Sequence, residues 1–81
     1  MFELIHKSYI IVKQYIHQMN RIKEVAEHEG ITQIEIAHKL NKSKSLVSMY
    51  MNNRVQPNLT TLFQIAKILS VDPRDLISVK K

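Results

Sequence analysis

The chain has 81 residues, 44% of them hydrophobic and 23% charged, with one glycine and two prolines, a composition typical of one small globular domain. It contains no cysteine, which excludes disulfide bonds, cysteine-ligated zinc and a cysteine nucleophile. Its 12 lysine and arginine residues outnumber its 7 acidic residues, giving a net charge of +5, and such an excess favours a polyanion as partner.

Residues 1–19 are predicted to form an extension outside the main domain. Apolar side chains recur there at the spacing of one helix face, at Ile5, Tyr9, Val12, Ile16 and Met19. The apolar run at 9–12 is equally consistent with a short strand. Three interpretations stay open: the extension pairs with its copy in a dimer, it docks on the domain's own core, or translation starts at Met19 instead.

No membrane or secretory segment is predicted. The longest uninterrupted apolar run, at 9–12, is far shorter than the ~18 residues that a membrane-spanning helix needs. A signal peptide is also not recognisable, because charged residues interrupt the apolar character and no small-residue cleavage site follows. A cytoplasmic protein is therefore expected.

Residues 20–78 are predicted to form five short helices and no strand, at 20–29, 32–40, 43–52, 59–69 and 73–78. In the first four of these helices the apolar residues recur on one face. The predicted inward-facing residues are Ile22, Val25, Ala26, Ile36, Ala37, Leu40, Leu46, Val47, Tyr50, Leu62, Ile65, Ala66 and Leu69. The fold class expected from this pattern is all-α.

Polar residues and the single glycine mark the ends of these helices. Gly30 ends the first helix. Thr32 and Glu35 have the spacing of a capping box at the start of the second. The other predicted N-terminal caps are Ser43, Asn58 and Asp72, the last followed by Pro73 at the first helical position.

The helices at 32–40 and 43–52, joined by a tight turn at Asn41 and Lys42, have the pattern of a helix-turn-helix. Ala37 is the small residue that lets such helices touch. The outer face of the second helix has no acid and consists of Lys44, Ser45, Ser48, Met49 and Asn52. The net charge is zero over 1–29, +3 over 30–58 and +2 over 59–81. The basic excess thus begins near this helix pair, which favours a nucleic acid, although ordinary solubilising charge explains the same count.

Over residues 22–77 the sequence resembles the phage repressor and Cro helix-turn-helix proteins, also called the XRE family. The resemblance covers about 55 of the 81 residues without a gap. Residues in register with the family pattern include Thr32, Gln33, Ile36, Ala37, Ser43, Val47, Ser48, Pro57, Leu59, Leu62, Ala66, Leu69, Ser70, Val71 and Leu76. The resemblance implies a five-helix lambda-repressor-like DNA-binding domain at 20–78, preceded by the extension and followed by a tail at 79–81.

Four positions depart from the family pattern. Asn41 and Asn53 stand where glycine is common, and asparagine tolerates the positive φ that glycine supplies there. Lys42 replaces an apolar residue, so the turn is expected to be more basic than in most members. Met51 replaces a glutamate late in the second helix, so the local hydrogen bonds of that glutamate are not expected.

The resemblance implies that helix 43–52 contacts DNA bases through Lys44, Ser45, Ser48 and Met49. Lys44 is suited to a guanine edge or to a phosphate, the serines to donors or acceptors, and Met49 to a thymine methyl group. The alternative for the serines is ordinary helix surface, and for Met49 it is partial packing.

The resemblance also implies contacts to the DNA backbone from Thr32, Gln33, Asn52, Arg54, Gln56 and Asn58. Gln33 begins a helix, where a side-chain amide and the helix N-terminus together hold a phosphate in related proteins. The last four residues belong to the loop that follows the second helix. Thr32 and Asn58 have a competing role as helix caps.

Neither a metal site nor an enzyme is expected. His6, His17, His28 and His38 are 11, 11 and 10 residues apart, unlike the pairs three or four apart that hold a metal on a helix. The sequence shows no catalytic triad, phosphate-binding loop or dinucleotide motif, so no cofactor is expected either.

These observations together predict a bacterial or phage-encoded regulator of transcription. It is expected to bind double-stranded DNA sequence-specifically as a homodimer, with helix 43–52 in the major groove. A phage repressor, a controller of a restriction–modification operon and an antitoxin all fit. The alternative is a protein-interaction module that binds a partner protein through the amphipathic extension.

Overall fold

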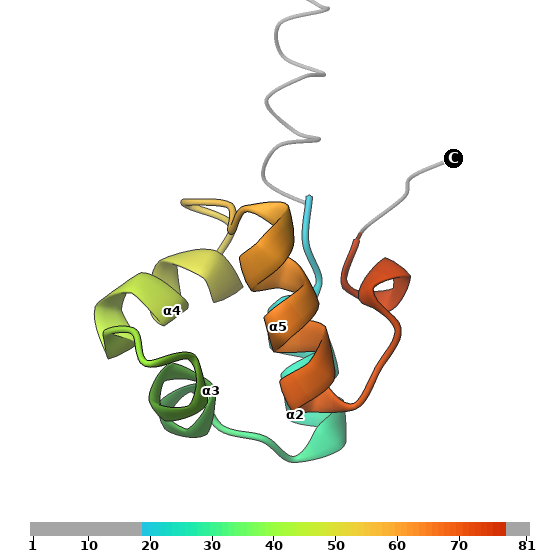
Figure 1. Cartoon of the computed structure of the whole chain (residues 1–81), viewed down its shortest axis with the longest axis horizontal. Coiled ribbons are helices and arrows are strands. Elements are labelled where there is room, and N and C mark those ends of the chain that lie inside the picture. The colour runs from blue at the N-terminus through green and yellow to red at the C-terminus, as the bar shows by residue number, and fades with distance from the viewer. Residues whose placement is uncertain (1–18, 78–81) are drawn as a thin grey trace, which may run out of the picture.

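The structure, a computed structural model, describes residues 19–77. These residues form four α-helices, α2 (Ile22–Glu29), α3 (Gln33–Leu40), α4 (Lys44–Met51) and α5 (Leu59–Leu69), and a 3-10 helix, η1 (Pro73–Leu76) (Figure 1). The described part contains no strand, which confirms the all-α class, and none of its helices is long and apolar enough to span a membrane. The predictions for residues 1–18 and for the tail at 79–81 fall outside the described residues.

Two predicted helix boundaries are wrong. The first helix begins at Ile22 rather than at 20, because Asn20 forms an antiparallel bridge with Ile77 and the N–H of Arg21 donates to the carbonyl of Leu76 over 2.8 Å. The fifth helix is not α-helical, since η1 is only four residues long and the N–H of Asp75 donates three residues back, to Asp72. A turn this short favours 3-10 hydrogen bonding.

The side chain of Asp72 begins η1 as predicted. Its Oδ1 accepts from the Arg74 N–H at 2.9 Å, and its Oδ2 accepts from Arg74 Nη2 at the same distance. The hydrogen bond from the Arg74 guanidinium lowers the pKa of Asp72 from 3.8 to about 2. Both side chains face solvent, where water and salt screen the attraction, so this pair contributes little to the fold.

The other predicted helix ends are confirmed. Thr32 and Glu35 form a complete capping box, in which Thr32 Oγ1 accepts from the Glu35 N–H at 3.2 Å. Ser43 Oγ accepts from the Leu46 N–H at 3.1 Å, and so caps α4. Three of the helices end at a residue with a left-handed backbone conformation. These are Gly30 at φ 71° after α2, Asn41 at φ 57° after α3 and Ser70 at φ 58° after α5.

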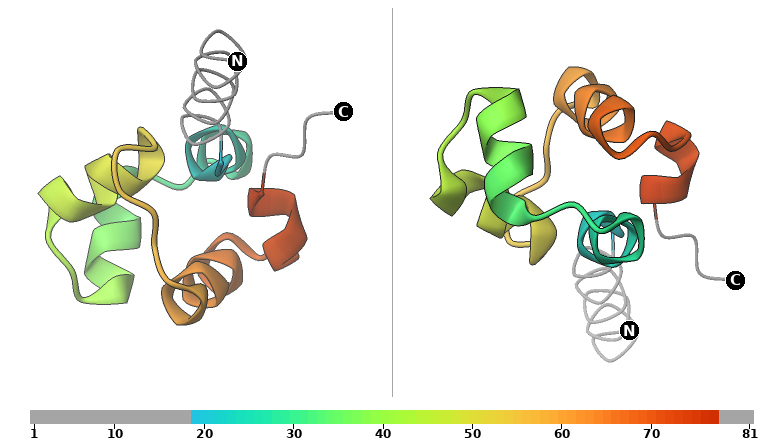
Figure 2. Two further views of the ribbon diagram at one scale, coloured as in Figure 1. Left: turned by 90° about the horizontal axis from the view of Figure 1, so that it is seen from above. Right: turned by 90° about the horizontal axis from the view of Figure 1, so that it is seen from below.

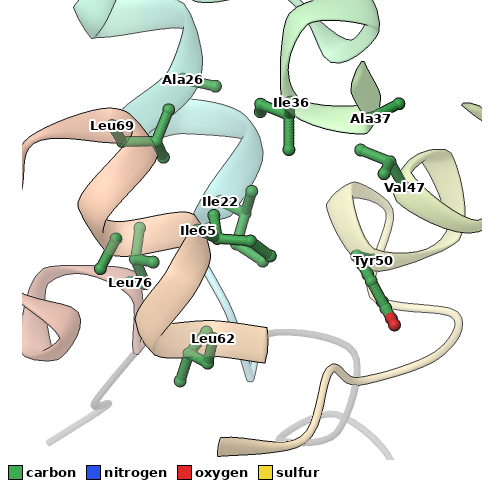
Figure 3. Packing of buried hydrophobic residues seen from close by; sticks show 11 residues of the cluster. Ile22, Ala26, Ile36, Ala37, Val47, Tyr50, Leu62, Ile65, Leu69 and Leu76 are labelled. Atoms are coloured by element: carbon green, nitrogen blue, oxygen red, sulfur yellow. The ribbon is translucent and has the colours of Figure 1, made fainter. Parts of the chain in front are cut away.

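Helix α5 lies at the centre of the packing, in contact with α2, α3 and η1. In Figure 2, α2 and α5 lie in the middle of the domain. Helices α3 and α4 lie on one side of them, and η1 lies on the other. The buried apolar residues of the described part, most of them labelled in Figure 3, are Ile22, Ala26, Ile36, Ala37, Val47, Tyr50, Leu62, Ile65, Ala66, Leu69 and Leu76. Three predicted inward residues, Val25, Leu40 and Leu46, are only partly buried and pack at the edge of this core.

The contact between α3 and α4 depends on the small side chain of Ala37. This residue is 3% exposed, and Figure 3 shows it facing the fully buried Val47 of α4. The turn between the helices is closed by backbone hydrogen bonds, among them one from the Lys42 N–H to the carbonyl of Ala37 at 3.0 Å. Because protein interiors are close-packed, a larger side chain at position 37 is expected to press against α4.

Replacing Ala37 with Leu should therefore lower the free energy of unfolding by about 1–3 kcal/mol, because the added carbon atoms push α3 and α4 apart. Urea unfolding followed by circular dichroism measures the change. His38→Leu, on the exposed side of the same helix, is the matched control and should change the stability by less than about 0.5 kcal/mol. Equal stability of Ala37→Leu and the wild type would show that the two helices are not in tight contact.

Candidate nucleic-acid interface

The first turns of α3 and α4 line an open groove of about 690 Å³ on the outside of the helix pair. Five of the predicted DNA-contacting residues meet there with one further residue, and the lining consists of Thr32, Gln33, Ile34, Lys44, Ser45 and Ser48. The fold thus brings together residues from the amino ends of two helices that are separate in the sequence. This groove and the face of α4 beside it are the candidate interface.

The orientation of α4 follows from its buried side. Val47 and Tyr50 are 0% and 6% exposed, so they fix which face of the helix points to the core. On the other side, Lys44 and Ser45 are exposed, and Ser48 is half-buried. The side chain of Met49 is 36% exposed, a value that agrees both with contact to a base and with partial packing. The first turn of α4 contains no acid, so no side chain there repels a polyanion.

Gln33 connects the two helices of the groove. Its Nε2 donates to the backbone carbonyl of Lys44 over 3.1 Å, which joins the first turn of α3 to the first turn of α4. A side-chain amide nitrogen has two hydrogens, so one N–H remains for a second acceptor. The predicted phosphate contact of Gln33 stays a prediction, and the amide has an additional role in holding the start of α4.

Three other predicted contact residues form hydrogen bonds within the protein. Thr32 and Asn58 act as the caps that the sequence predicts, and Asn58 Oδ1 accepts from the Thr61 N–H at 2.8 Å. Asn52 Nδ2 donates to the carbonyl oxygen of Ser48 at 2.8 Å, which fixes this amide on the last turn of α4. For all three, contact with DNA stays a prediction.

The loop at 52–58 continues the interface beyond α4. Asn53 has φ 58°, as predicted for a residue that replaces glycine. The N–H groups of Arg54 and Val55 both donate to the carbonyl of Met49, at 2.9 and 3.3 Å, so the loop folds back over the end of the helix. The Arg54 side chain is exposed. Met51, in place of the family's glutamate, packs against the core.

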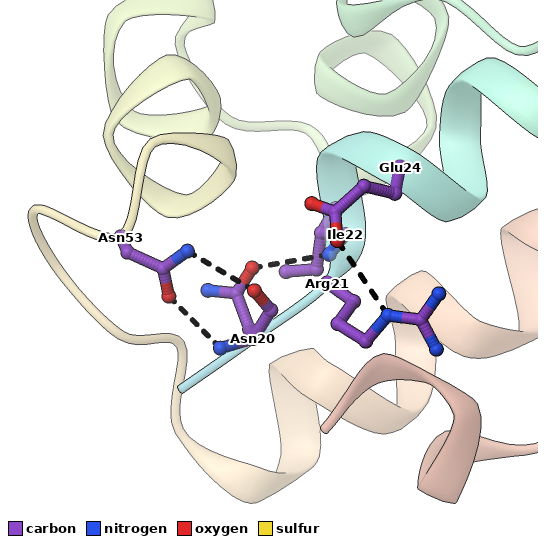
Figure 4. Close-up of polar contacts among 5 residues, drawn as sticks. All are labelled: Asn20, Arg21, Ile22, Glu24 and Asn53. Carbon is purple, nitrogen blue, oxygen red and sulfur yellow. Dashed lines mark hydrogen bonds and ion pairs between the residues drawn. The ribbon is translucent and has the colours of Figure 1, made fainter. Parts of the chain in front are cut away.

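Two residues were missed by the sequence analysis. Ile34 lines the groove and is 62% exposed, and its position outside the apolar spacing of α3 was a usable signal. Asn20 is only 5% exposed and bonds to Asn53 and Gln56, as Figure 4 shows in part. No sequence spacing predicts that cluster, because the bonded residues are 33 and 36 positions apart. The amide of Gln56 is thus placed mainly by contacts within the protein.

No group of three His, Asp or Glu side chains suited to a metal ion occurs within the described range, 19–77. His6 and His17 lie outside that range. The residues that line the groove offer ammonium, hydroxyl, amide and backbone donors, which suit base edges and phosphate oxygens.

Comparison with known proteins agrees with this geometry. A protein family described as helix-turn-helix matches residues 22–76, well over half of the chain. The crystal structure of a protein from Bacteroides fragilis, provisionally assigned as DNA-binding, is 38% identical, with a TM-score of 0.73. The match covers 74% of this chain and 97% of that one, while no curated protein matches. The chain belongs to the XRE family of helix-turn-helix DNA-binding proteins.

Proposed function

We propose that this DNA-binding protein is a sequence-specific regulator of transcription that contacts bases in the major groove through α4. The observation that supports the proposal is the exposed, acid-free face of α4 beside the groove formed with α3. A helix presented in this way fits the major groove of B-DNA. The XRE family consists of DNA-binding proteins rather than enzymes, in agreement with the expected lack of catalysis. Such a regulator acts where bacterial or phage DNA is held, in the cytoplasm.

The proposed base contacts come from Lys44, Ser45, Ser48 and Met49. Lys44 and Ser45 are exposed on the first turn of α4, which is the part of a recognition helix that enters the groove first. The Lys44 ammonium donates to guanine O6 and N7, and the Met49 thioether chain contacts a thymine methyl group. Ser48 is half-buried and has its hydroxyl next to Asn52 Nδ2, at 3.3 Å, so its rotamer is restricted before DNA binds.

The proposed backbone contacts flank α4 on both sides. They come from Thr32, Gln33, Asn52, Arg54, Gln56 and Asn58. Arg54 is the strongest of these candidates, because its charged side chain is exposed. It extends from a loop whose backbone is hydrogen-bonded to α4. The remaining side chains are polar but uncharged, and they add hydrogen bonds without adding charge.

We further propose that the regulator acts as a homodimer. One domain offers one recognition helix, whereas two copies span two half-sites roughly 34 Å apart. Exposed apolar side chains on α5 support self-association: Leu59 and Phe63, one helical turn apart, are 70% and 58% exposed. Exposed apolar groups that lie together are typical of protein–protein contacts.

Selection of bound duplexes from a random pool tests the function and the symmetry together. The expected result is one preferred sequence with two inverted half-sites. A preferred site without two-fold symmetry would contradict the homodimer. If no salt-dependent binding to random duplex is detected, the result contradicts the DNA-binding role and favours the protein-interaction alternative.

Lys44→Ala should weaken binding to the selected site by about 1–3 kcal/mol and relax the preference at one base pair per half-site. Thermal melting should hardly change, because Lys44 is exposed at a helix start and the bond from Gln33 uses its backbone carbonyl. Affinities for all single-base variants of the site measure the effect. Lys42→Ala, in the exposed turn before α4, is the matched control and should leave base preference unchanged. A uniform loss across all variants would make Lys44 a phosphate contact.

Arg54→Ala should weaken binding to the selected site and to random duplex by similar factors, because a phosphate contact has no sequence information. The slope of log affinity against log salt should fall in magnitude by about 1. Titrations at several salt concentrations on both duplexes give the two numbers. Loss of specific binding with unchanged random binding would place Arg54 at a base instead.

A further inference from the structure

The start of the domain is joined to the loop after α4 through a buried asparagine. Asn20, just before α2, is 5% exposed, and a buried amide requires partners for its donors and acceptor. Its Nδ2 donates to the carbonyl oxygen of Tyr50 and to Gln56 Oε1, both at 2.8 Å. Its Oδ1 accepts from the Ile22 N–H at 3.1 Å. The described part of the chain leaves no buried side-chain polar atom unpaired.

The amide of Asn53 completes this arrangement by pairing with the backbone of Asn20. Asn53 Oδ1 accepts from the Asn20 N–H at 2.9 Å, and Asn53 Nδ2 donates to the Asn20 carbonyl at 3.0 Å (Figure 4). The two bonds resemble those of a neighbouring strand. Asn53 Oδ1 also accepts from Gln56 Nε2 at 3.0 Å. We call Asn20, Asn53 and Gln56 the amide cluster.

The amide cluster holds both sides of the residue that we place on the DNA backbone. Arg54 directly follows Asn53 and lies two positions before Gln56, and its own N–H is bonded to the carbonyl of Met49. Hydrogen bonds therefore hold the loop on its buried side, while the Arg54 side chain is exposed. A loop that is ordered before binding loses less conformational entropy when it meets a partner.

We propose that Asn53, held by Asn20, is a positioning residue for DNA binding. The amide cluster fixes the loop so that Arg54 meets the DNA backbone without an additional ordering cost. This inference rests on the proposed contact of Arg54 with DNA. No bond of the cluster reaches Lys44 or the groove at the start of α4, so base preference does not depend on it.

A double-mutant cycle between Asn53→Gly and Arg54→Ala tests the proposal. Glycine adopts the positive φ of position 53 without strain, so the turn remains possible when the amide is removed. Asn53→Gly should weaken binding about three- to tenfold, equally on specific and random duplex. In the Arg54→Ala background the same change should have a much smaller effect, since the charged side chain that it positions is gone.

Ser70→Gly is the matched control for the glycine substitution. Ser70 has the same φ of 58°, makes no side-chain hydrogen bond within residues 19–77 and lies at the far end of α5. It should leave DNA affinity unchanged. All affinities are measured well below the melting temperature of the least stable variant, so that unfolding does not lower the apparent affinity.

Two results overturn the inference. One is unchanged affinity of Asn53→Gly, and the other is the same loss in the presence and absence of Arg54. If Arg54→Ala alone leaves the DNA affinity and the salt slope unchanged, the proposed contact of Arg54 with the DNA backbone is wrong. This single variant therefore distinguishes failure of the proposed contact from failure of the positioning role.

Asn20→Ala keeps the test decisive if Asn53→Gly does not fold. It removes the amide bonds of position 20, yet the Tyr50 carbonyl still accepts from the Asn53 N–H at 3.2 Å. Gln56 is half-buried, so water replaces its lost donor. The two bonds between Asn53 and the backbone of position 20 remain in this variant, so a smaller loss is expected, again non-additive with Arg54→Ala. Additive losses would reject the positioning role.

Discussion

Helices α2, α3 and α4 have eight residues each, which is too few for a helix to persist alone in water. They are stable because their apolar faces are buried in one core, and α5 supplies the centre of it. Helices α2, α3 and η1 pack on α5, while α4 packs on α2 and α3. The chain has no cysteine to add a disulfide. Every other feature of the domain therefore depends on this burial.

Because the core holds α4 by one side only, its other side is available to a partner. Val47 and Tyr50 anchor the helix, and Lys44 and Ser45 face outward. The outward-facing side chains are not required to cap the start of α4, because the Ser43 hydroxyl accepts from the Leu46 N–H of the first turn. Because one face of α4 packs in the core and the other is exposed, the exposed side chains can vary without loss of the fold.

The polar contacts of the domain act over two different ranges. Caps such as Thr32 and Asn58 bond within three residues and define where a helix begins. The amide cluster bonds over 30 or more residues and ties the chain before α2 to the end of α4. The first kind specifies helices, whereas the second adds to the backbone bonds from the loop to the end of α4 and connects that loop to the start of the domain. A buried network of this kind is stable only when every member is paired.

The sequence alone was enough to predict helices α2 to α5, the residues that cap them and most of their inner faces, because helical spacing and capping are local properties. It also determined the family and the acid-free face of α4. The three-dimensional structure was needed to show that Asn20 is non-helical and buried, that Ile34 lines the groove and that Gln33 joins α3 to α4. Of these features, the exposure of Ile34 is signalled by its position outside the apolar spacing of α3. The other two arise from contacts between residues far apart in the chain, for which the sequence has no periodic signal.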